Sequence, residues 1–245
     1  MIVNEDRKTS PKQRIIIAAI AVFMLASTFA LYVGIVLNFE NSETQSTNVN
    51  NRMNRFAELY NDYQNRKSDR AKKLSEQYFE QFKGYRTEVK AFNAAAATSL
   101  ETRDIVVGEG REITYEYADE KKEEISSLDT NYAAYYIGWL SDETIFDSSY
   151  NSKDDPTALN DPLIGSSNMI QGWIEGIEGM RIGGVREITI PSVLGYGDKE
   201  QNDIPANSPL KFVVMLVEKP EALEVSDELE TLYSEFMGGS LRAQQ

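Results

Sequence analysis

The longest apolar run of the chain lies near its N-terminus and contains no charged side chain. It covers residues 15–37 (IIIAAIAVFMLASTFALYVGIVL), and a helix of that length extends about 35 Å, enough to cross a hydrocarbon layer of about 30 Å. A cleaved signal peptide is the competing interpretation, but its apolar region is normally about 7–15 residues and ends at a small-x-small site. The run ends instead at Val36-Leu37-Asn38-Phe39. The pattern therefore favours an uncleaved transmembrane helix.

The charges on either side of this run predict its direction. Basic side chains precede it at Arg7, Lys8, Lys12 and Arg14, whereas residues 38–51 contain glutamates and no basic residue. The positive-inside rule keeps such an N-terminal segment, residues 1–14, in the cytoplasm and places the rest of the chain outside. We therefore expect a single-pass membrane protein whose folded part is extracytoplasmic.

A polar segment and then a helical pattern follow the apolar run. Residues 38–50 are typical of a flexible linker, and residues 51–98 predict a helical stalk. Two sets of apolar residues recur there at steps of three and four: Met53, Phe56, Tyr60 and Tyr63, then Phe82, Tyr85, Val89, Phe92 and Ala96. Residues 64–70 between them have no apolar side chain, so two helices and one helix with a polar middle are both open. A spacer packed on a partner helix is favoured over self-association or client binding.

Strand-like runs replace the helical pattern between residues 100 and 220. Apolar, aromatic or β-branched runs predict strands at residues 104–107, 132–140, 187–190 and 210–217. Residues 169–180 (MIQGWIEGIEGM) predict one short helix among them. The fold class is therefore α+β, with a curved antiparallel sheet wrapped around one short helix. Residues 221–245 predict a C-terminal acidic helix, capped by Ser226, and a tail.

Composition excludes several classes of chemistry. The chain has 25 Lys and Arg against 39 Asp and Glu, a net charge of −14, so phosphate backbones repel it and nucleic acid is not an expected partner. It has no cysteine and no histidine, which removes disulfides, thiolate nucleophiles, imidazole bases and the commonest metal ligands. We expect neither a metal nor a cofactor.

Short motifs between residues 138 and 212 occur in one characteristic order. They are GWLSDETIFDSS at 138–149, IQGWIEGIEGM at 170–180, TIP at 189–191, LGYG at 194–197, IPAN at 204–207 and LKF at 210–212. In this order and spacing they resemble the FKBP-type peptidyl-prolyl cis–trans isomerase domain, over roughly half of the chain. The resemblance implies an FKBP-like isomerase domain at residues 100–220.

The resemblance also implies a substrate pocket and its residues. The catalytic residues it implies are Tyr136, Phe146, Asp147, Trp173, Tyr196 and Phe212. The substrate-binding residues it implies are Met169, Ile170, Ile204 and Leu159, the last in place of an aromatic wall that is missing here. Two further departures are Glu143, where the family turn has glycine, and the acidic loop at residues 198–203.

Rotation of an X–Pro bond needs no proton transfer, so the absence of histidine and cysteine is compatible with it. We expect catalysis by preferential binding of the twisted amide in an apolar aromatic pocket. The expected partners are proline-containing unfolded or exported polypeptides, the membrane through the N-terminal helix, and macrolide inhibitors. One alternative is a membrane-tethered holdase-type chaperone that uses the stalk, with weak or no isomerase activity. Another is a structural envelope protein that self-associates through the stalk.

Overall fold

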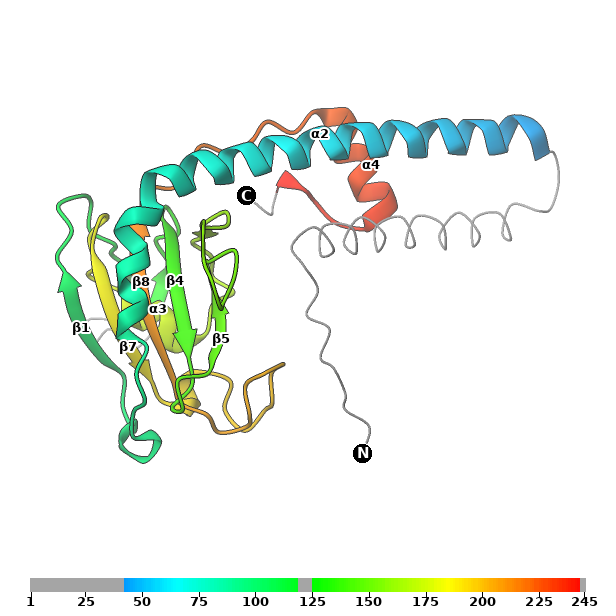
Figure 1. The fold of residues 1–245 in the computed structure, drawn as a ribbon. Coiled ribbons are helices and arrows are strands. Elements are labelled where there is room, and N and C mark those ends of the chain that lie inside the picture. The colour runs from blue at the N-terminus through cyan, green and yellow to red at the C-terminus, as the bar shows by residue number, and fades with distance from the viewer. Residues whose placement is uncertain (1–41, 119–124, 243–245) are drawn as a thin grey trace, which may run out of the picture. The chain divides into compact units, whose positions relative to one another are not determined.

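The computed structural model describes residues 42–118 and 125–242. The chain divides into two compact units that meet in sequence between Leu59 and Tyr60. The described part of the first unit is helical and forms the beginning of α2 (Ser42–Phe82). The second unit contains the end of this helix, all the strands and the two other described α-helices (Figure 1).

The described residues contain no candidate for a membrane span. Within 42–118 and 125–242 no helix is both long enough and apolar enough to cross a bilayer. The long helix among them, α2, has charged side chains throughout its length. This finding overturns the expected single-pass membrane localisation with an extracytoplasmic folded part. The apolar run that motivated the expectation, residues 15–37, lies outside the described residues together with residues 1–14.

An antiparallel sheet forms the centre of the second unit. Among the described residues it has six strands in the order β1-β7-β8-β4-β5, with β6 also paired to β4. Their bounds are β1 Glu101–Val106, β4 Ala133–Trp139, β5 Ile145–Ser148, β6 Leu163–Ile164, β7 Val185–Ile190 and β8 Leu210–Val217. A separate ribbon pairs β2 (Glu116–Tyr117) with β3 (Ile125–Ser127). The strands predicted at 132–140, 187–190 and 210–217 are confirmed as β4, β7 and β8.

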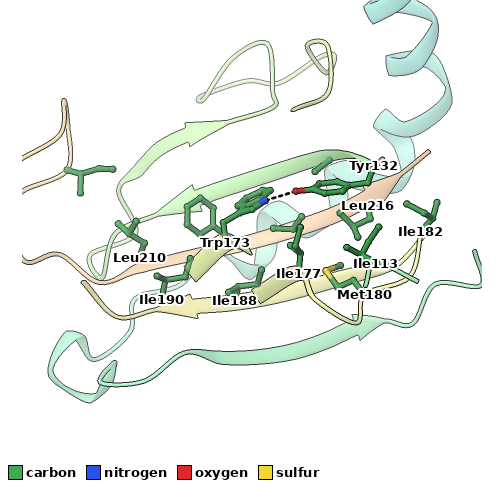
Figure 2. Close-up of a cluster of buried hydrophobic side chains, with 14 of the residues drawn as sticks. Ile113, Tyr132, Trp173, Ile177, Met180, Ile182, Ile188, Ile190, Leu210 and Leu216 are labelled. Atoms are coloured by element: carbon green, nitrogen blue, oxygen red, sulfur yellow. Dashed lines mark hydrogen bonds between the residues drawn. The ribbon is translucent and has the colours of Figure 1, made fainter. Parts of the chain in front are cut away.

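One face of the sheet packs against the short helix α3 (Gln171–Ile177), the helix expected within residues 169–180. Alternate residues of β8 point to this face, because side chains alternate along a strand. These β8 residues are Leu210, Phe212, Val214 and Leu216. They join Ile177, Ile188 and Ile190 in one buried cluster, part of which Figure 2 shows. The indole N–H of Trp173 donates to the Tyr132 hydroxyl over 3.3 Å within this cluster. The predicted arrangement of a sheet around one short helix is therefore present.

The opposite face of the sheet is also covered, which the sequence pattern did not predict. The intervening residues of β4 point to it, namely Ala133, Tyr135, Ile137 and Trp139. They meet Phe82 at the end of α2, and Tyr85, Val89 and Phe92 beyond it. The end of α2 and the segment after it cross the sheet in Figure 1. Phe82 is fully buried, with its ring centroid 6.1 Å from that of Tyr135 and 5.4 Å from that of Tyr150. The end of α2 is thus part of the core of this unit.

The helix expected to continue through Ala96 ends earlier, at Phe82. A 3₁₀ helix, η1 (Lys83–Glu88), follows, then extended residues from Val89 and a short η2 (Ala94–Ala96). Gly84 removes the side chain that favours helix at the first turn after Phe82. Of the apolar residues predicted at three- and four-residue steps, Tyr85, Val89 and Phe92 do pack on the sheet, but through turns rather than along a helix, and Ala96 is exposed.

α2 runs without interruption through the polar residues 64–70, so of the two alternatives the structure has one helix with a polar middle. This stretch carries arginines that hold the C-terminal segment. Arg66 donates to the carbonyl of Glu224 over 2.9 Å, and Arg70 donates to that of Glu221 over 3.2 Å. Arg70 also forms an ion pair of 2.5 Å with Asp161, and both side chains are largely buried.

The predicted C-terminal helix is α4 (Asp227–Met237). The Ser226 side chain accepts a hydrogen bond from the Leu229 amide over 3.1 Å, and Gly238 ends the helix at a φ of 67°. Leu229 and Leu232 are buried, and the Tyr233 ring lies 6.0 Å from that of Tyr60 on α2. The acidic helix therefore packs back onto the second unit.

Candidate active site

Four aromatic rings from four different elements meet on the α3 side of the sheet. Phe212 of β8 lies at their centre, with its ring centroid 5.5 Å from those of Phe146 and Trp173 in edge-on contacts. Tyr136 of β4 makes another edge contact of 5.5 Å with Trp173 and lies 6.3 Å from Phe212. Edge-to-face geometry at these separations is favourable for aromatic pairs. The structure thus brings together four residues that the family resemblance implied for the pocket.

A glycine and a bulge give these rings their room and direction. Gly138 lies on β4, where an added Cβ would come within 2.6 Å of the Phe146 ring and 2.7 Å of the Phe212 ring. The pairing of β4 with β5 shifts register between Gly138 and Trp139, because Gly138 opposes Asp147 and Trp139 opposes Ile145. Phe146 is therefore the extra residue of a β-bulge, and bulges redirect side chains next to functional sites.

A cavity of about 530 Å³ opens beside Phe146. Its walls come from the end of β5 and from the loop that follows η3 (Ser192–Leu194). They are Phe146, Asp147, Tyr196, Gln201, Asn202, Asp203 and Ile204. The loop is closed by reciprocal backbone bonds between Gln201 and Ile204, of 2.9 and 2.7 Å, with Asn202 at a φ of 47°. Tyr196 and Ile204 thus face Phe146 and Asp147 across one hollow.

Trp173 and Phe212 lie deeper than the cavity walls. They are 3% and 5% exposed, they are not among the residues that line the cavity, and both belong to the buried cluster in which Figure 2 labels Trp173. Tyr196 is 36% exposed and forms part of the mouth. The arrangement is an open hollow with mostly polar walls, in which Phe146 and Tyr196 are the aromatic residues, and Phe146 alone connects it to the ring cluster.

The polar centre of the site is a hydrogen bond from Tyr136 to Asp147. The Tyr136 hydroxyl donates to Asp147 Oδ2 over 2.5 Å, while Oδ1 of the same carboxylate accepts the Ser148 amide over 2.8 Å. Burial raises the pKa of the Tyr136 hydroxyl above its usual value near 10, and the bond to Asp147 raises it further. Tyr136 therefore stays a neutral hydrogen-bond donor at physiological pH.

The remaining residues implied for substrate binding divide into two groups. Met169 and Ile170 pack on the α3 side of the sheet. The Ile170 carbonyl accepts hydrogen bonds from the amides of Trp173 and Ile174 at the start of α3. Leu159 lies elsewhere, buried in the cluster under α2 on the opposite face of the sheet. Its amide donates to the Ser75 hydroxyl of α2 over 2.8 Å, which holds its loop on that side. The expectation that Leu159 replaces a missing wall of the pocket is therefore corrected.

Three cavity residues were not among those expected, namely Gln201, Asn202 and Asp203. The sequence marked their loop, residues 198–203, only by its acidic charge. Its position between Tyr196 and Ile204, both expected at the pocket, was the available signal. Within the described ranges, no group of three or more acidic side chains is placed to hold a metal ion.

The site therefore offers the apolar side chains of Phe146 and Ile204, a neutral phenol bound to a carboxylate, and the phenol of Tyr196 at the mouth. Such groups bind and orient a small apolar ring and can donate to a carbonyl. They include no nucleophile with an adjacent base, and they suit a reaction in which no bond is broken.

Comparisons with known proteins concern this part of the chain. Residues 121–217 match the family model described as FKBP-type peptidyl-prolyl cis-trans isomerase. FK506-binding protein 2 of Debaryomyces hansenii is 44% identical over 86 residues, which cover 35% of this chain and 61% of that protein. FK506-binding protein 4 of Aspergillus fumigatus is 46% identical over 86 residues, which cover 17% of that longer protein. The chain thus matches less than two thirds of the length of either relative.

A shorter relative is matched more completely. The FK506-binding protein of Neisseria meningitidis serogroup C is 42% identical over 84 residues, which cover 34% of this chain and 73% of that protein. Among solved structures, the crystal structure of AtFKBP13 shares 30% identity, covers 49% of this chain and 93% of its own, and superposes with a TM-score of 0.36.

Proposed function

Because this chain belongs to the FKBP-type peptidyl-prolyl cis–trans isomerase family, we propose that it catalyses rotation about X–Pro peptide bonds in unfolded or flexible polypeptides. The observation that carries the proposal is the aromatic cluster of Tyr136, Phe146, Trp173 and Phe212 beside a cavity of about 530 Å³. Phe146 belongs to both the cluster and the cavity wall, so a pyrrolidine ring in the hollow would lie against this aromatic group.

The reaction is slow without help because the planar amide must lose its resonance. The barrier is about 18–20 kcal/mol, and X–Pro rotation takes tens to hundreds of seconds. In the twisted transition state the carbonyl oxygen has lost charge and the proline nitrogen is no longer conjugated. A site that binds the twisted form better than either planar form accelerates rotation without any proton transfer.

The residues then take the following roles. Trp173 and Phe212 form the floor and inner wall under the proline ring, and Phe146 forms the side wall. Tyr136 keeps Asp147 oriented at the twisted carbonyl, because its hydroxyl stays protonated and bound to that carboxylate. Met169 and Ile204 complete the apolar rim.

Two donors are placed for the substrate carbonyls. Tyr196 lies at the mouth of the cavity and donates its phenolic proton. The Ile170 amide precedes the first turn of α3, where helix geometry provides no intrahelical acceptor, and it serves as the second donor. FK506-type macrolides, which the names of the relatives mention, are proposed to occupy the same hollow and to compete with substrate.

A protease-coupled assay on a proline-containing peptide tests the proposal with the full chain. The wild type is expected to accelerate isomerisation, and a Phe146→Ala, Asp147→Ala double variant is expected to lose most of the acceleration. Glu112→Ala is the matched control, since Glu112 is a half-exposed carboxylate that forms an ion pair with Arg181 away from the cavity. Wild-type activity no better than that of the double variant contradicts the proposal.

The chaperone alternative receives no support from the second unit. It requires the apolar stripe of the stalk to be available for clients, but Tyr63 and Phe82 are 4% and 0% exposed. The same burial removes these two rings from any surface for self-association.

A further inference from the structure

Four residues, 89–92, cross the outer face of the sheet and end at the turn between β4 and β5. We call them the strap. The indole N–H of Trp139 donates to the carbonyl of Lys90 over 3.0 Å, and the Phe92 amide donates to the carbonyl of Ser141 over 3.1 Å. The Ala91 amide donates to Glu143 Oε1 over 3.0 Å. Three hydrogen bonds thus join the strap to the last residue of β4 and to the turn.

The strap is itself anchored. The Val89 and Phe92 side chains pack against the buried cluster under α2, and the Lys211 ammonium lies 5.3 Å from the centroid of the Phe92 ring. Lys211 also pairs with Glu187 over 3.2 Å. The strap is therefore a fixed partner for the turn rather than a loose segment beside it.

The turn has a residue that does not suit its backbone. Glu143 has a φ of 70°, in the left-handed region that favours glycine. The other non-glycine residues with positive φ in the described ranges are Asn202 and Asn207, a residue type that tolerates this region. The turn has hydrogen bonds of its own, from the Glu143 amide to the Leu140 carbonyl over 3.1 Å and from the Leu140 amide to the Thr144 carbonyl over 2.9 Å. The Glu143 carboxylate accepts the strap amide from the strained position, so the strap adds a further bond that favours this conformation.

The geometry of the turn reaches the site through a short edge strand. β5 has four residues and pairs only with β4 in the sheet order, with the bulge at Phe146 in the middle. At its far end, the Ser149 amide bonds the Tyr136 carbonyl over 2.9 Å. At its near end, Ile145 pairs with Trp139, and the Lys153 ammonium donates to the Phe146 carbonyl over 3.0 Å. The turn and the strap continue directly from this end. A shift of the turn therefore moves Phe146 and Asp147 directly.

We infer that the strap, through its bond to Glu143, holds the β4–β5 turn in the conformation that positions Phe146 and Asp147. A glycine at this place would adopt the same positive φ without such a bond. Glu143 is in this sense a positioning residue, and it does not touch the substrate. The inference rests on the proposed isomerase function for its kinetic consequence, but its structural consequence is independent of that function.

Three substitutions at Glu143 separate the acceptor from the strain. Glu143→Ala removes the acceptor and keeps a side chain at positive φ, so kcat/KM is expected to fall about five-fold, the scale of one lost hydrogen bond. Glu143→Gln keeps an acceptor oxygen, and Glu143→Gly removes the strain. Both are expected to keep kcat/KM within about two-fold of the wild type. Glu112→Ala is the charge-matched control and is expected to have no effect.

A double-mutant cycle tests the strap itself. Ala91→Pro removes the amide that donates to Glu143. It is expected to lower kcat/KM about five-fold in the wild-type background and by less than about two-fold in the Glu143→Gly background, since the unstrained turn no longer needs the bond. Circular dichroism at the assay temperature confirms that each variant is folded. If Ala91→Pro does not fold, the three Glu143 variants still test whether the bond to the strap positions Phe146 and Asp147.

Amide NMR spectra keep this inference separate from the proposed function. Glu143→Ala is expected to shift the resonances of Phe146 and Asp147, and Glu143→Gln to restore them, whether or not the chain is active. An inactive wild type contradicts the proposed function alone. Unchanged Phe146 and Asp147 resonances in folded Glu143→Ala overturn the positioning role, and so does an equal effect of Ala91→Pro in both backgrounds.

Discussion

Replacing Phe82 by alanine tests whether the end of α2 belongs to the folded core. The ring is fully buried between α2 and the outer face of the sheet, and its centroid lies 5.4 to 6.1 Å from those of Tyr85, Tyr135 and Tyr150. The Tyr150 hydroxyl also donates to the Phe82 carbonyl over 3.1 Å. Loss of the ring leaves a hole bordered by these side chains and by the backbone of α2.

The expected loss of stability follows from this burial. Returning a fully buried phenylalanine side chain to water costs about 1.5–3 kcal/mol, and the cavity brings measured Phe→Ala losses to about 3–5 kcal/mol. The rigid aromatic neighbours limit collapse around the hole, so we expect about 4 kcal/mol. For a domain of this size that loss lowers the melting temperature by about 10 °C. Since whole domains have stabilities of about 5–15 kcal/mol, the effect is readily measured.

Urea unfolding of the full chain, followed by circular dichroism, measures the change. Two controls bracket it. Phe82→Leu keeps most of the apolar volume and is expected to cost about 1.5 kcal/mol or less. Phe79→Ala removes a half-buried ring of the same helix and is expected to cost about 1 kcal/mol. A Phe82→Ala loss no larger than that of Phe79→Ala would show that the helix end does not pack on the sheet in solution.

Further consequences can be measured on the same protein. The Tyr135 hydroxyl is buried and has no hydrogen-bond partner among the described residues, so Tyr135→Phe is expected to raise the free energy of unfolding by about 1 kcal/mol; a decrease in urea unfolding would contradict this. Gly138→Ala places a Cβ within 2.6 Å of the Phe146 ring, so kcat/KM is expected to fall about ten-fold or more in a protein that remains folded, and unchanged kinetics would contradict the packing. Burial raises the pKa of Tyr115 and Tyr132 above the usual value near 10. The folded chain then keeps protons that the unfolded chain loses, so stability should fall above about pH 10 by up to about 1.4 kcal/mol per pH unit for each such tyrosine, and a flat urea profile from about pH 8 to about pH 11 would refute this.

Strands were more predictable from this sequence than the segment that covers them. β8 has the bounds of its apolar run, because every one of its eight residues except Lys211 faces one of two buried clusters. Residues 82–96 carry an equally regular pattern, yet only Phe82 is in an α-helix. Spacing of three and four reports that side chains share one side, and a 3₁₀ helix followed by an extended segment satisfies that as well as an α-helix does.

Residues of the candidate site could be predicted where they lie on paired strands or on the helix. The place of a residue in a loop, such as Leu159, could not. Tyr136, Phe146, Trp173 and Phe212 lie on strands or a helix whose register is set by the sheet and its core, so motif order carries them to one place. Leu159 lies in a loop that is held by a bridge to Tyr150 and by a long-range bond to Ser75, 84 residues earlier in the chain. No local pattern reports a contact of that kind.

The sequence of β4 indicates that both faces of this strand are buried. An antiparallel strand with one wet face alternates apolar and polar residues, whereas residues 132–140 (YAAYYIGWL) offer no polar face at all. Such a strand is buried on both sides, and one short helix covers only one of them. A second cover had to come from elsewhere in the chain, and residues 82–92 supply it. A chain that begins at residue 100, where the family resemblance begins, would expose Tyr135, Ile137 and Trp139. Residues 82–92 are therefore needed for the stability of this domain.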